Sequence, residues 1–435
     1  MNQTSKLPKE TAEQPLLMGP RPPDVHISFV RKQHQFPESS LDLDALKVVR
    51  RLRRFGHETY LVGGCIRDLL LGAVPKDFDV VTSAKPAEIK ALFRNCRLIG
   101  RRFRLAHLHF KEHKIIEVAT FRREPLDSDD LSSRHAAGNL FGTAADDAVR
   151  RDFTVNALMY DVEKGEILDW VGGLADIDDG IIRAIGHPER RLPEDPVRII
   201  RAIKFAAKLN LNIDPVLAEE MCQSAPLMAE CSKARLLEEL FKILRSGFAA
   251  TCMRQLQSTG AMKYLLPDFQ ASLEQVSYTS WTLLEKADAL VRDGFNASDA
   301  FLLAVFLYPA LEELIWEAND VAKAVSAALK PIAQPLQFTK KNMATVRNAY
   351  ISQRRMVKGP RNKRTRRLVE RDFIGEALDL LEITERAPTS IIESWRKLLM
   401  RQINQRKNVG VRPRSRRRRP PVRKTRTPRT VDNSQ

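Results

Sequence analysis

Cysteine is scarce in this chain, and its placement disfavours cross-links and structural metal. No two cysteines form a C-x-x-C pair, their number is odd, and no histidine lies at zinc-finger spacing from them. A disulfide framework and a structural zinc site are therefore not expected, and a reducing cytoplasm is the predicted location. The five cysteines are Cys65, Cys96, Cys222, Cys231 and Cys252.

Long apolar runs are absent too. No stretch of about 18 apolar residues occurs, so no membrane-spanning helix is predicted. Residues 1–23 are polar and proline-rich and lack the apolar centre of a signal peptide. No G-x-G-x-x-G fingerprint follows a predicted strand, which excludes a Rossmann-type dinucleotide enzyme.

Acidic residues are outnumbered by basic ones. The 435 residues contain 72 Lys and Arg against 54 Asp and Glu, a formal net charge of +18. This surplus favours a polyanionic partner, either nucleic acid or an acidic membrane surface, with RNA preferred given the motifs below. Ten of the surplus charges lie between Val411 and Thr430, which contains four prolines and no acid, so this segment is predicted to be disordered.

The pattern of apolar residues divides the chain into a mixed part and a helical part. Short strand-like runs alternate with helical spacing up to about residue 185, and the 3.6-residue period dominates from there on. The predicted fold class is α+β, with a small mixed-sheet head, an all-helical neck and body, and a disordered basic tail. The predicted divisions are a flexible leader at 1–44, a catalytic head at 45–185, a neck at 186–265, a body at 266–405 and a tail at 406–435.

Individual elements are predicted from the same patterns. Within the head we expect strands at 60–62, 78–81, 104–110 and 114–121, helices at 42–60, 66–71 and 86–93, and a polar loop at 124–138. Beyond it we expect helices at 196–209, 215–224, 234–246, 251–265, 278–292, 297–308 and 311–329.

The motif Asp77-Phe78-Asp79 is the first that points to chemistry. On a strand, residues two apart project to the same side, so the two carboxylates would stand together while Phe78 faces the core. Adjacent carboxylates repel unless a cation holds them, and Mg²⁺ is the usual one where phosphates are co-ligands. A lone D-x-D is common by chance, so its weight comes from its neighbours. Together with these neighbours, the D-x-D motif predicts two Mg²⁺ ions that assist an in-line displacement at phosphorus.

Three neighbouring features fit this chemistry. Gly63-Gly64 falls between a strand and a helix, where backbone N–H groups can approach a triphosphate, and Arg67 lies one turn into that helix. Glu117 sits in an apolar strand, where a charge is costly unless it is paired or bound to metal. The glycine pair and Glu117 each have a purely structural alternative. The glycines fit an ordinary turn, and Glu117 fits a salt bridge to Arg122 or another arginine.

Two later clusters add phosphate- and base-binding candidates. Arg151, Asp152 and Asn156 are predicted to contact the triphosphate and sugar, with Asp152 also close to the metal. Asp195 and Arg198 lie three positions apart, at the start of a helix with Pro196 in its first turn. Their side chains offer a hydrogen-bond acceptor beside a forked hydrogen-bond donor, as reading the edge of a base requires. Arg201, one turn further, is assigned to the same nucleotide pocket. Alone, these clusters also fit a charged helix start and a helix capped by Glu194 or Asp195.

Other candidates carry less weight. The alternating His107, His109 and His113 suggest a zinc site only weakly, because no acidic or cysteine partner has suitable spacing. Cys65, next to Gly64, fits a small core residue better than a nucleophile.

Taken together, the motifs G-G-x-x-R-D, D-x-D, R-R-D-F-T-x-N and E-D-P-V-R resemble the class II nucleotidyltransferases, the family of bacterial poly(A) polymerases and tRNA CCA-adding enzymes. The resemblance covers about 46–265. The stretch F-R-N-C-R-L-I-G-R-R-F-R-L-A-H at 93–107 and the basic C-terminus resemble the poly(A) polymerases in particular. One departure is Lys204, where the family pattern leads us to expect Arg, because Lys keeps the charge but loses the planar fork.

The resemblance implies roles for individual residues. It makes Asp77 and Asp79 the metal-binding pair and Glu117 the third carboxylate. It makes Asp152 the acid of the R-R-D motif, and it gives base reading to Asp195 and Arg198.

The function expected on these grounds is transfer of AMP from ATP to RNA 3′ ends, with two Mg²⁺ ions as cofactors and RNA-decay proteins as possible partners. The segment Arg354–Arg367 and the tail would hold the RNA backbone through charge. Two rivals remain: a CCA-adding enzyme with the same fold, and a non-catalytic RNA-binding protein on an inactive head.

Overall fold

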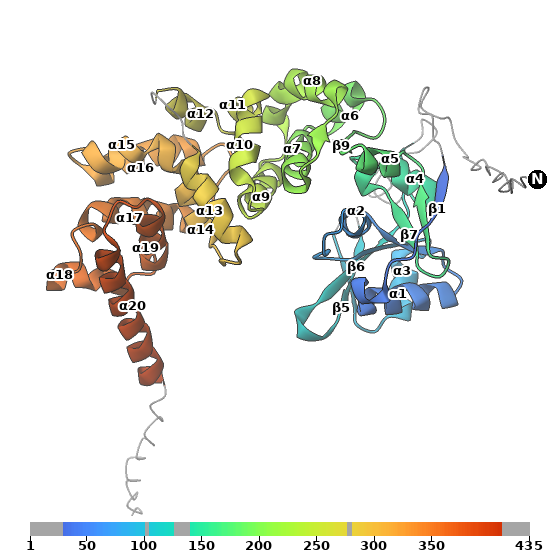
Figure 1. Ribbon diagram of the computed structural model, residues 1–435, viewed down its shortest axis with the longest axis horizontal. Coiled ribbons are helices and arrows are strands. Elements are labelled where there is room, and N and C mark those ends of the chain that lie inside the picture. Colours follow the sequence, from blue (N-terminus) through green and yellow to red (C-terminus); the bar gives the residue numbers. More distant parts are fainter. Residues whose placement is uncertain (1–28, 101–103, 126–139, 276–280, 411–435) are drawn as a thin grey trace, which may run out of the picture.

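The computed structural model describes residues 29–100, 104–125, 140–275 and 281–410. The predicted disordered segment from 411 onward and most of the loop predicted at 124–138 lie outside these residues. Within them, the predicted fold class is confirmed. A mixed sheet forms the head, and helices form nearly all of the rest (Figure 1).

The head is built on one sheet with the strand order β1-β8-β7-β2-β3-β6-β5-β4. All neighbours are antiparallel except β3 and β6, which run parallel with Val80 opposite Val118. That single parallel pair brings the D-x-D segment beside the strand of Glu117. The strands are β1 Val30–Gln33, β2 Thr59–Val62, β3 Asp79–Thr82, β4 Cys96–Ile99, β5 Leu105–His109, β6 Ile115–Thr120, β7 Met159–Asp161 and β8 Glu166–Asp169.

Both faces of this sheet are covered, because apolar side chains alternate along its central strands. Leu61 of β2 joins a core shared with helices α1 and α2, whereas Tyr60 and Val62 join a second core with α4 on the opposite face. The head helices are α1 Leu43–Arg54, α2 Gly64–Leu70, α3 Pro86–Leu92, α4 Ala144–Val149 and α5 Gly173–Asp178.

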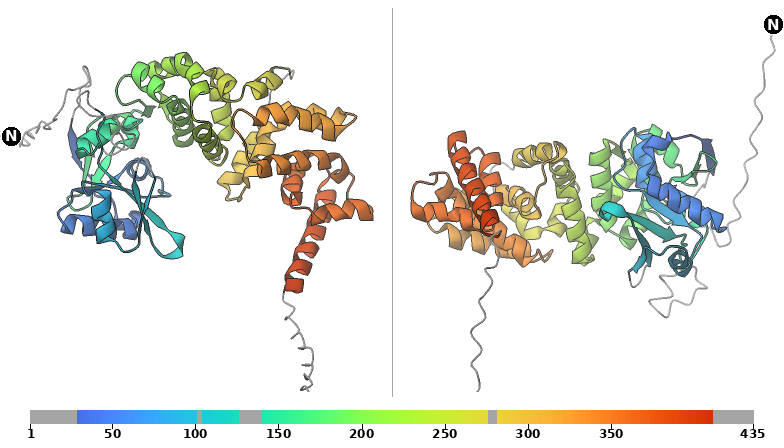
Figure 2. Two further views of the ribbon diagram at one scale, coloured as in Figure 1. Left: turned by 180° about the vertical axis from the view of Figure 1, so that it is seen from behind. Right: turned by 90° about the horizontal axis from the view of Figure 1, so that it is seen from below.

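The helices beyond the head form a curved arm, with α18 and α20 at the end farthest from the sheet (Figures 1 and 2). One continuous apolar core runs along this arm and takes in Phe153 and Val155 of the head, so head and neck share packing. A short parallel pair, β9 (Ile181–Ile182) and β10 (Asn212–Ile213), also links the two. The neck helices are α6 Pro188–Glu194, α7 Val197–Leu209, α8 Pro215–Ser224, α9 Lys233–Leu244, α10 Ala249–Ser258 and α11 Ala261–Leu265.

The body continues the same packing. Its central helices α14, α17 and α19 lie against one another, and α14 is apolar on every side because neighbours surround it. No helix within the described ranges is long and apolar enough to cross a membrane. The body helices are α12 Pro267–Glu274, α13 Thr282–Arg292, α14 Asp299–Leu307, α15 Glu312–Glu317, α16 Val321–Ala333, α17 Lys340–Met356, α18 Lys363–Arg366, α19 Ile374–Ile383 and α20 Thr389–Gly410.

Several predicted boundaries were wrong. Residues 30–33 are not a loose leader, because they pair with β8 as an edge strand. Strands β4, β7, β8, β9 and β10 were also missed. The helix predicted at 251–265 breaks at Gly260, whose φ of 72° is left-handed, and the one at 311–329 breaks where Asp320 caps α16. Helix α20 continues to Gly410, past the tail boundary set at 406.

Candidate active site

An acidic cleft opens at the start of β3. Asp79 begins that strand, Asp77 stands two residues earlier, and Phe78 between them is 8% exposed and packs into the core. The two carboxylates therefore share one side, as the strand pattern predicts. Glu117, on the parallel strand β6, reaches the same cleft. The cleft holds about 520 Å³ and is lined by Asp77, Phe78, Asp79, His113, Lys114, Ile115 and Glu117.

The charge balance of this cleft is negative. Burial raises the pKa of Asp79 to about 6, and the like charges of Glu117 and Asp77 add to the rise, while Arg151 opposes it. Lys114 lines the cleft, but its ammonium is held by Asp42 at 2.5 Å and Asp44 at 3.0 Å. Lys114 is therefore engaged outside the cleft, and a bound cation would stabilise the ionised form of Asp79.

Glu117 has a partner that the sequence did not suggest. Its Oε1 lies 3.4 Å from Nε2 of His107, which faces it across the β5–β6 pairing, whereas the alternative considered above was Arg122. Among the described residues, no group of three or more His, Cys, Asp or Glu side chains is close enough to hold a metal by itself. Asp77, Asp79 and Glu117 therefore do not by themselves make a complete metal site in this structure.

The Gly63-Gly64 turn lies directly beside the acidic cleft, because Val62, the last residue of β2, pairs with Asp79. Gly63 has a φ of 79°, in the left-handed region that favours glycine. A Cβ there would stand 3.3 Å from Nη1 of Arg151 and 3.4 Å from the backbone oxygen of Asn156. The turn, Arg151 and Asn156 thus form one close-packed group at the cleft.

Arg151 is fixed by Asp147, a residue that the motif analysis missed. The Asp147 carboxylate accepts from Nη2 of Arg151 at 2.8 Å and from Nε of Arg150 at 3.3 Å, while its own side chain is buried. Asp147 also accepts from the backbone N–H of Arg122. The four-residue spacing from Asp147 to Arg151 on a helix was the available signal.

Arg67 is buried rather than open to a ligand. It is 3% exposed, its Nε donates to Asp68 at 2.9 Å, and its Nη1 donates to Oδ1 of Asn156. In this structure its role is to hold Asn156, and a direct phosphate contact would require it to leave Asp68.

Asp152 is also engaged by protein groups. Its Oδ2 accepts from Nε of Arg201 at 2.7 Å, and its Oδ1 accepts from Asn156 at 3.1 Å and from the backbone N–H of Phe153 at 2.9 Å. Burial raises the pKa of Asp152, but Arg201 and Asn156 outweigh burial and hold it below its ordinary value. The carboxylate is therefore ionised and joins the head to α7.

Glu239 on α9 extends this connection, and no sequence motif pointed to it. Its Oε2 accepts from Nζ of Lys204 at 2.6 Å, and its Oε1 lies 3.6 Å from Nη1 of Arg201. Both Lys204 and Glu239 are buried, at 8% and 5% exposed. Phe205 lies against three cations, those of Arg67, Arg201 and Lys204, at 5.1, 5.3 and 5.0 Å from its ring centre. Lys204 thus contacts a buried carboxylate rather than an open pocket.

Asp195 and Arg198 lie at the junction of α6 and α7, but they do not bond to each other through their side chains. Asp195 accepts two bonds from Arg235 of α9, at 3.0 and 2.8 Å, and Arg198 Nη1 donates to the backbone oxygen of Arg191. The predicted cap by Glu194 or Asp195 is wrong, because Pro196 occupies the N-cap of α7 without any side-chain cap bond. Arg235 was missed, since it is 40 residues away in sequence.

Cys65 is a core residue, 2% exposed, and burial raises the pKa of its thiol to about 12. This agrees with the structural interpretation of the residue. All five cysteines are free.

Comparisons with known proteins place two matches to family models on this chain. Residues 59–183 match the family described as Poly A polymerase head domain, and residues 210–273 match the one described as Probable RNA and SrmB- binding site of polymerase A. Poly(A) polymerase I of Salmonella typhimurium is 39% identical over 384 residues, which cover 82% of this chain and 82% of that protein. The CCA-adding enzyme of Geobacillus kaustophilus is 32% identical over 309 residues, covering 69% and 73%.

A solved structure extends the likeness to three dimensions. The crystal structure of the Bacillus stearothermophilus CCA-adding enzyme in complex with CTP superposes with a TM-score of 0.63 at 26% identity, over 83% of this chain and 82% of that chain.

Proposed function

This chain belongs to the nucleotidyltransferase family of bacterial poly(A) polymerases and CCA-adding enzymes, and we propose that it adds AMP from ATP to the 3′-hydroxyl of RNA, with release of pyrophosphate. The observation that carries the proposal is the acidic cleft of Asp77, Asp79 and Glu117 beside the glycine turn and Arg151. Such a cleft complements the divalent cations that accompany a triphosphate.

Asp77 and Asp79 fit divalent metal, and Glu117 supplies a third carboxylate near them. Mg²⁺ commonly takes one or two protein carboxylates and completes its shell with substrate phosphates and water, which suits a cleft without a ready-made three-residue cluster. When bound as a pair, such ions lower the pKa of the attacking hydroxyl and neutralise the pyrophosphate leaving group. Binding of Glu117 to metal would release it from His107.

The surrounding residues bind and orient the nucleotide. We place the triphosphate between the Gly63-Gly64 turn and Arg151, whose position Asp147 fixes. Asn156 stands ready for the sugar, held by Arg67. Asp152 acts as a positioning residue, because its oxygens are taken by Arg201, Asn156 and a backbone N–H.

Base selection is assigned to the α6–α7 junction. Arg235 holds the Asp195 carboxylate in one orientation, and Arg198, anchored to a backbone oxygen, supplies the donor side. A fixed acceptor beside a fixed donor favours adenine over bases with another edge pattern. Arg201 borders this pocket and joins it to the head through Asp152.

RNA lies along the basic arm in this proposal, with the segment Arg354–Arg367 and the basic C-terminal residues holding its backbone by charge. Such contacts are sequence-blind and weaken as salt rises. The reaction would take place in the cytoplasm, where added 3′ tails mark RNA for processing or decay, and RNA-decay proteins are the proposed protein partners.

Addition of a C-C-A end to tRNA is the second candidate, favoured by the likeness to a CCA-adding enzyme bound to CTP. The greater identity and coverage of Poly(A) polymerase I favour adenylate addition instead. The two are separated by incubating the protein with Mg²⁺, one nucleotide at a time, and either a generic RNA or a tRNA that lacks its end. A long ladder with ATP alone supports the proposal, and short addition that requires CTP overturns it.

A non-catalytic RNA-binding protein is the third candidate function. It predicts no incorporation with any nucleotide while RNA binding persists, and the same incubation distinguishes it.

A further inference from the structure

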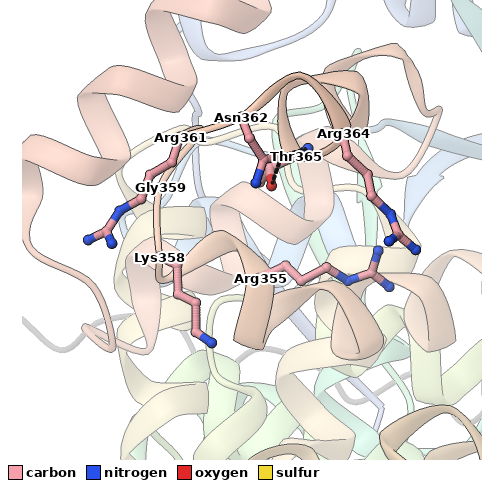
Figure 3. Close-up of a pocket in the computed structure, with 7 residues that line it drawn as sticks. All are labelled: Arg355, Lys358, Gly359, Arg361, Asn362, Arg364 and Thr365. Carbon is pink, nitrogen blue, oxygen red and sulfur yellow. Dashed lines mark hydrogen bonds between the residues drawn. The ribbon is translucent and has the colours of Figure 1, made fainter.

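Arg191, in the last turn of α6, is a largely buried arginine that the proposed reaction does not use. An arginine that holds RNA by charge faces solvent, as Arg355 and Arg364 do at the α17–α18 turn (Figure 3). The Arg191 side chain is instead only 11% exposed. Because a buried guanidinium is costly unless it is paired and hydrogen-bonded, the partners of Arg191 indicate what it does.

One nitrogen of Arg191 holds the backbone on both sides of Arg151. Its Nη2 donates to the Arg150 oxygen at 3.2 Å and to the Arg151 oxygen at 3.3 Å. These oxygens belong to the two planar peptide units that flank the Arg151 Cα, so the direction in which the Arg151 side chain leaves the backbone is fixed. The second of these units leads directly into Asp152. Arg191 therefore positions the backbone of the triphosphate-binding segment, whereas Asp147 holds the Arg151 side chain.

The same residue also holds the base-reading side of the site. The backbone oxygen of Arg191 accepts from Nη1 of Arg198 at 2.5 Å. The Glu194 carboxylate lies between the two arginines, 3.1 Å from Nη1 of Arg191 and 3.6 Å from Nη1 of Arg198. Glu124 of the head supplies a second carboxylate for Arg191, so its buried charge is balanced. One residue thus joins the α6–α7 junction to the segment at 150–152.

We propose that Arg191 is a positioning residue that couples recognition of the base to placement of the triphosphate. The inference rests on the proposed function, in which the α6–α7 junction reads the base and Arg151 holds the triphosphate. One nucleotide bridges the two places, so both sets of contacts form together only when their separation is fixed. A nucleotide whose base fits the junction poorly is then also presented poorly to the acidic cleft. Arg191 itself contacts protein groups and not the nucleotide.

The test compares binding of ATP with binding of tripolyphosphate, which carries the phosphates without a base. Titration calorimetry of the full chain, with Mg²⁺ and without RNA, gives both dissociation constants. In Arg191→Gln the affinity for ATP should fall roughly tenfold, the usual size for loss of hydrogen bonds from a charged donor, while the affinity for tripolyphosphate stays within about threefold. The preference for ATP over tripolyphosphate should therefore shrink. A purely structural role would lower both affinities in proportion and leave that preference unchanged.

Two further variants complete the comparison. Arg190→Gln removes the same charge one position earlier on α6, from an exposed side chain that, among the described residues, bonds to none of the groups held by Arg191, and should leave the preference within about twofold of native. Arg191→Lys keeps the charge but loses the planar fork, so the preference should recover only in part, and this variant carries the test if Arg191→Gln does not fold. A native preference in both Arg191 variants, or an equal fall in Arg190→Gln, would overturn the proposal.

Turnover separates this inference from the proposed function. The native protein should incorporate AMP, and Arg191→Gln should lower the ratio of kcat/KM for ATP over GTP by about the same factor as the binding preference. AMP incorporation by the native protein, with an unchanged ratio and an unchanged binding preference in Arg191→Gln, would refute the coupling and leave the proposed function standing. A native protein that binds ATP but incorporates no AMP would refute the proposed function, and the binding preference alone would then decide the coupling.

Discussion

Removing Glu239 should destabilise the protein far more than removing its neighbour Glu238. Glu239 is 5% exposed and is the acceptor for Nζ of Lys204, itself 8% exposed. In Glu239→Ala that ammonium would be left buried without a partner, which typically costs about 3–5 kcal/mol. For a cooperative unit of 150–250 residues each kcal/mol lowers the melting temperature by about 2–4 °C, so a fall of about 10 °C is expected.

Glu238→Ala is the matched control for this prediction. It makes the same chemical change one position earlier on α9, but the Glu238 side chain is 65% exposed and, among the residues that the structure describes, pairs only with Lys242. Exposed pairs contribute about 0–1 kcal/mol, so its melting temperature should stay within about 3 °C of native.

A second comparison separates charge burial from packing. Lys204→Met/Glu239→Leu removes both charges and should recover most of the lost stability, because apolar pairs of similar size often replace buried ion pairs without loss. Melting followed by circular dichroism provides the measurement. Native melting of Glu239→Ala would refute the buried-pair reasoning, and so would a double variant no more stable than the single one.

Two further predictions concern the site itself. Arg235→Gln should release Asp195 and lower the ratio of kcat/KM for ATP over GTP, whose base edge has the opposite donor and acceptor pattern, about threefold to tenfold, and an unchanged ratio would contradict the role given to Arg235. Burial and neighbouring carboxylates raise the pKa of Asp79 to about 6, so ionisation is disfavoured in the folded, metal-free protein. Stability relative to Asp79→Asn should therefore be highest below about pH 4, where the unfolded carboxyl is protonated too, and fall as the pH rises through 6. Melting in EDTA at pH 5 and 7.5 checks this, and an identical difference at both pH values would refute it.

Local patterns predicted the parts of this molecule that local chemistry determines. The D-x-D segment, the glycine turn and most amphipathic helices up to about residue 329 follow from alternation, φ preferences and the 3.6-residue period, whereas α17 and α20 were expected only as part of a helical body. The edge strand β1 was missed because its sequence, V-R-K-Q, reads as a polar loop, and its pairing with β8 depends on residues more than 130 positions away. Helix breaks at Gly260 and Asp320 depend on single residues within otherwise periodic runs.

The candidate site shows the same division. Asp77 and Asp79 follow from spacing, but the partners that define other roles come from distant elements. Arg235 bonds Asp195 across 40 residues, and Glu239 bonds Lys204 across 35. No local pattern indicates such pairs, because they arise only when α7 and α9 pack together. The burial of Arg67 could not be predicted from the sequence either, because it depends on α7, whose Phe205 lies against the guanidinium.

The central claim is that the carboxylates beside the glycine turn drive nucleotide transfer. Its most direct test is incorporation of labelled AMP into RNA by Asp79→Ala, measured together with RNA affinity by anisotropy. Loss of about 4 kcal/mol of metal-dependent stabilisation predicts incorporation about 10³-fold below native, with RNA affinity within about twofold. Native incorporation by this variant would contradict the account.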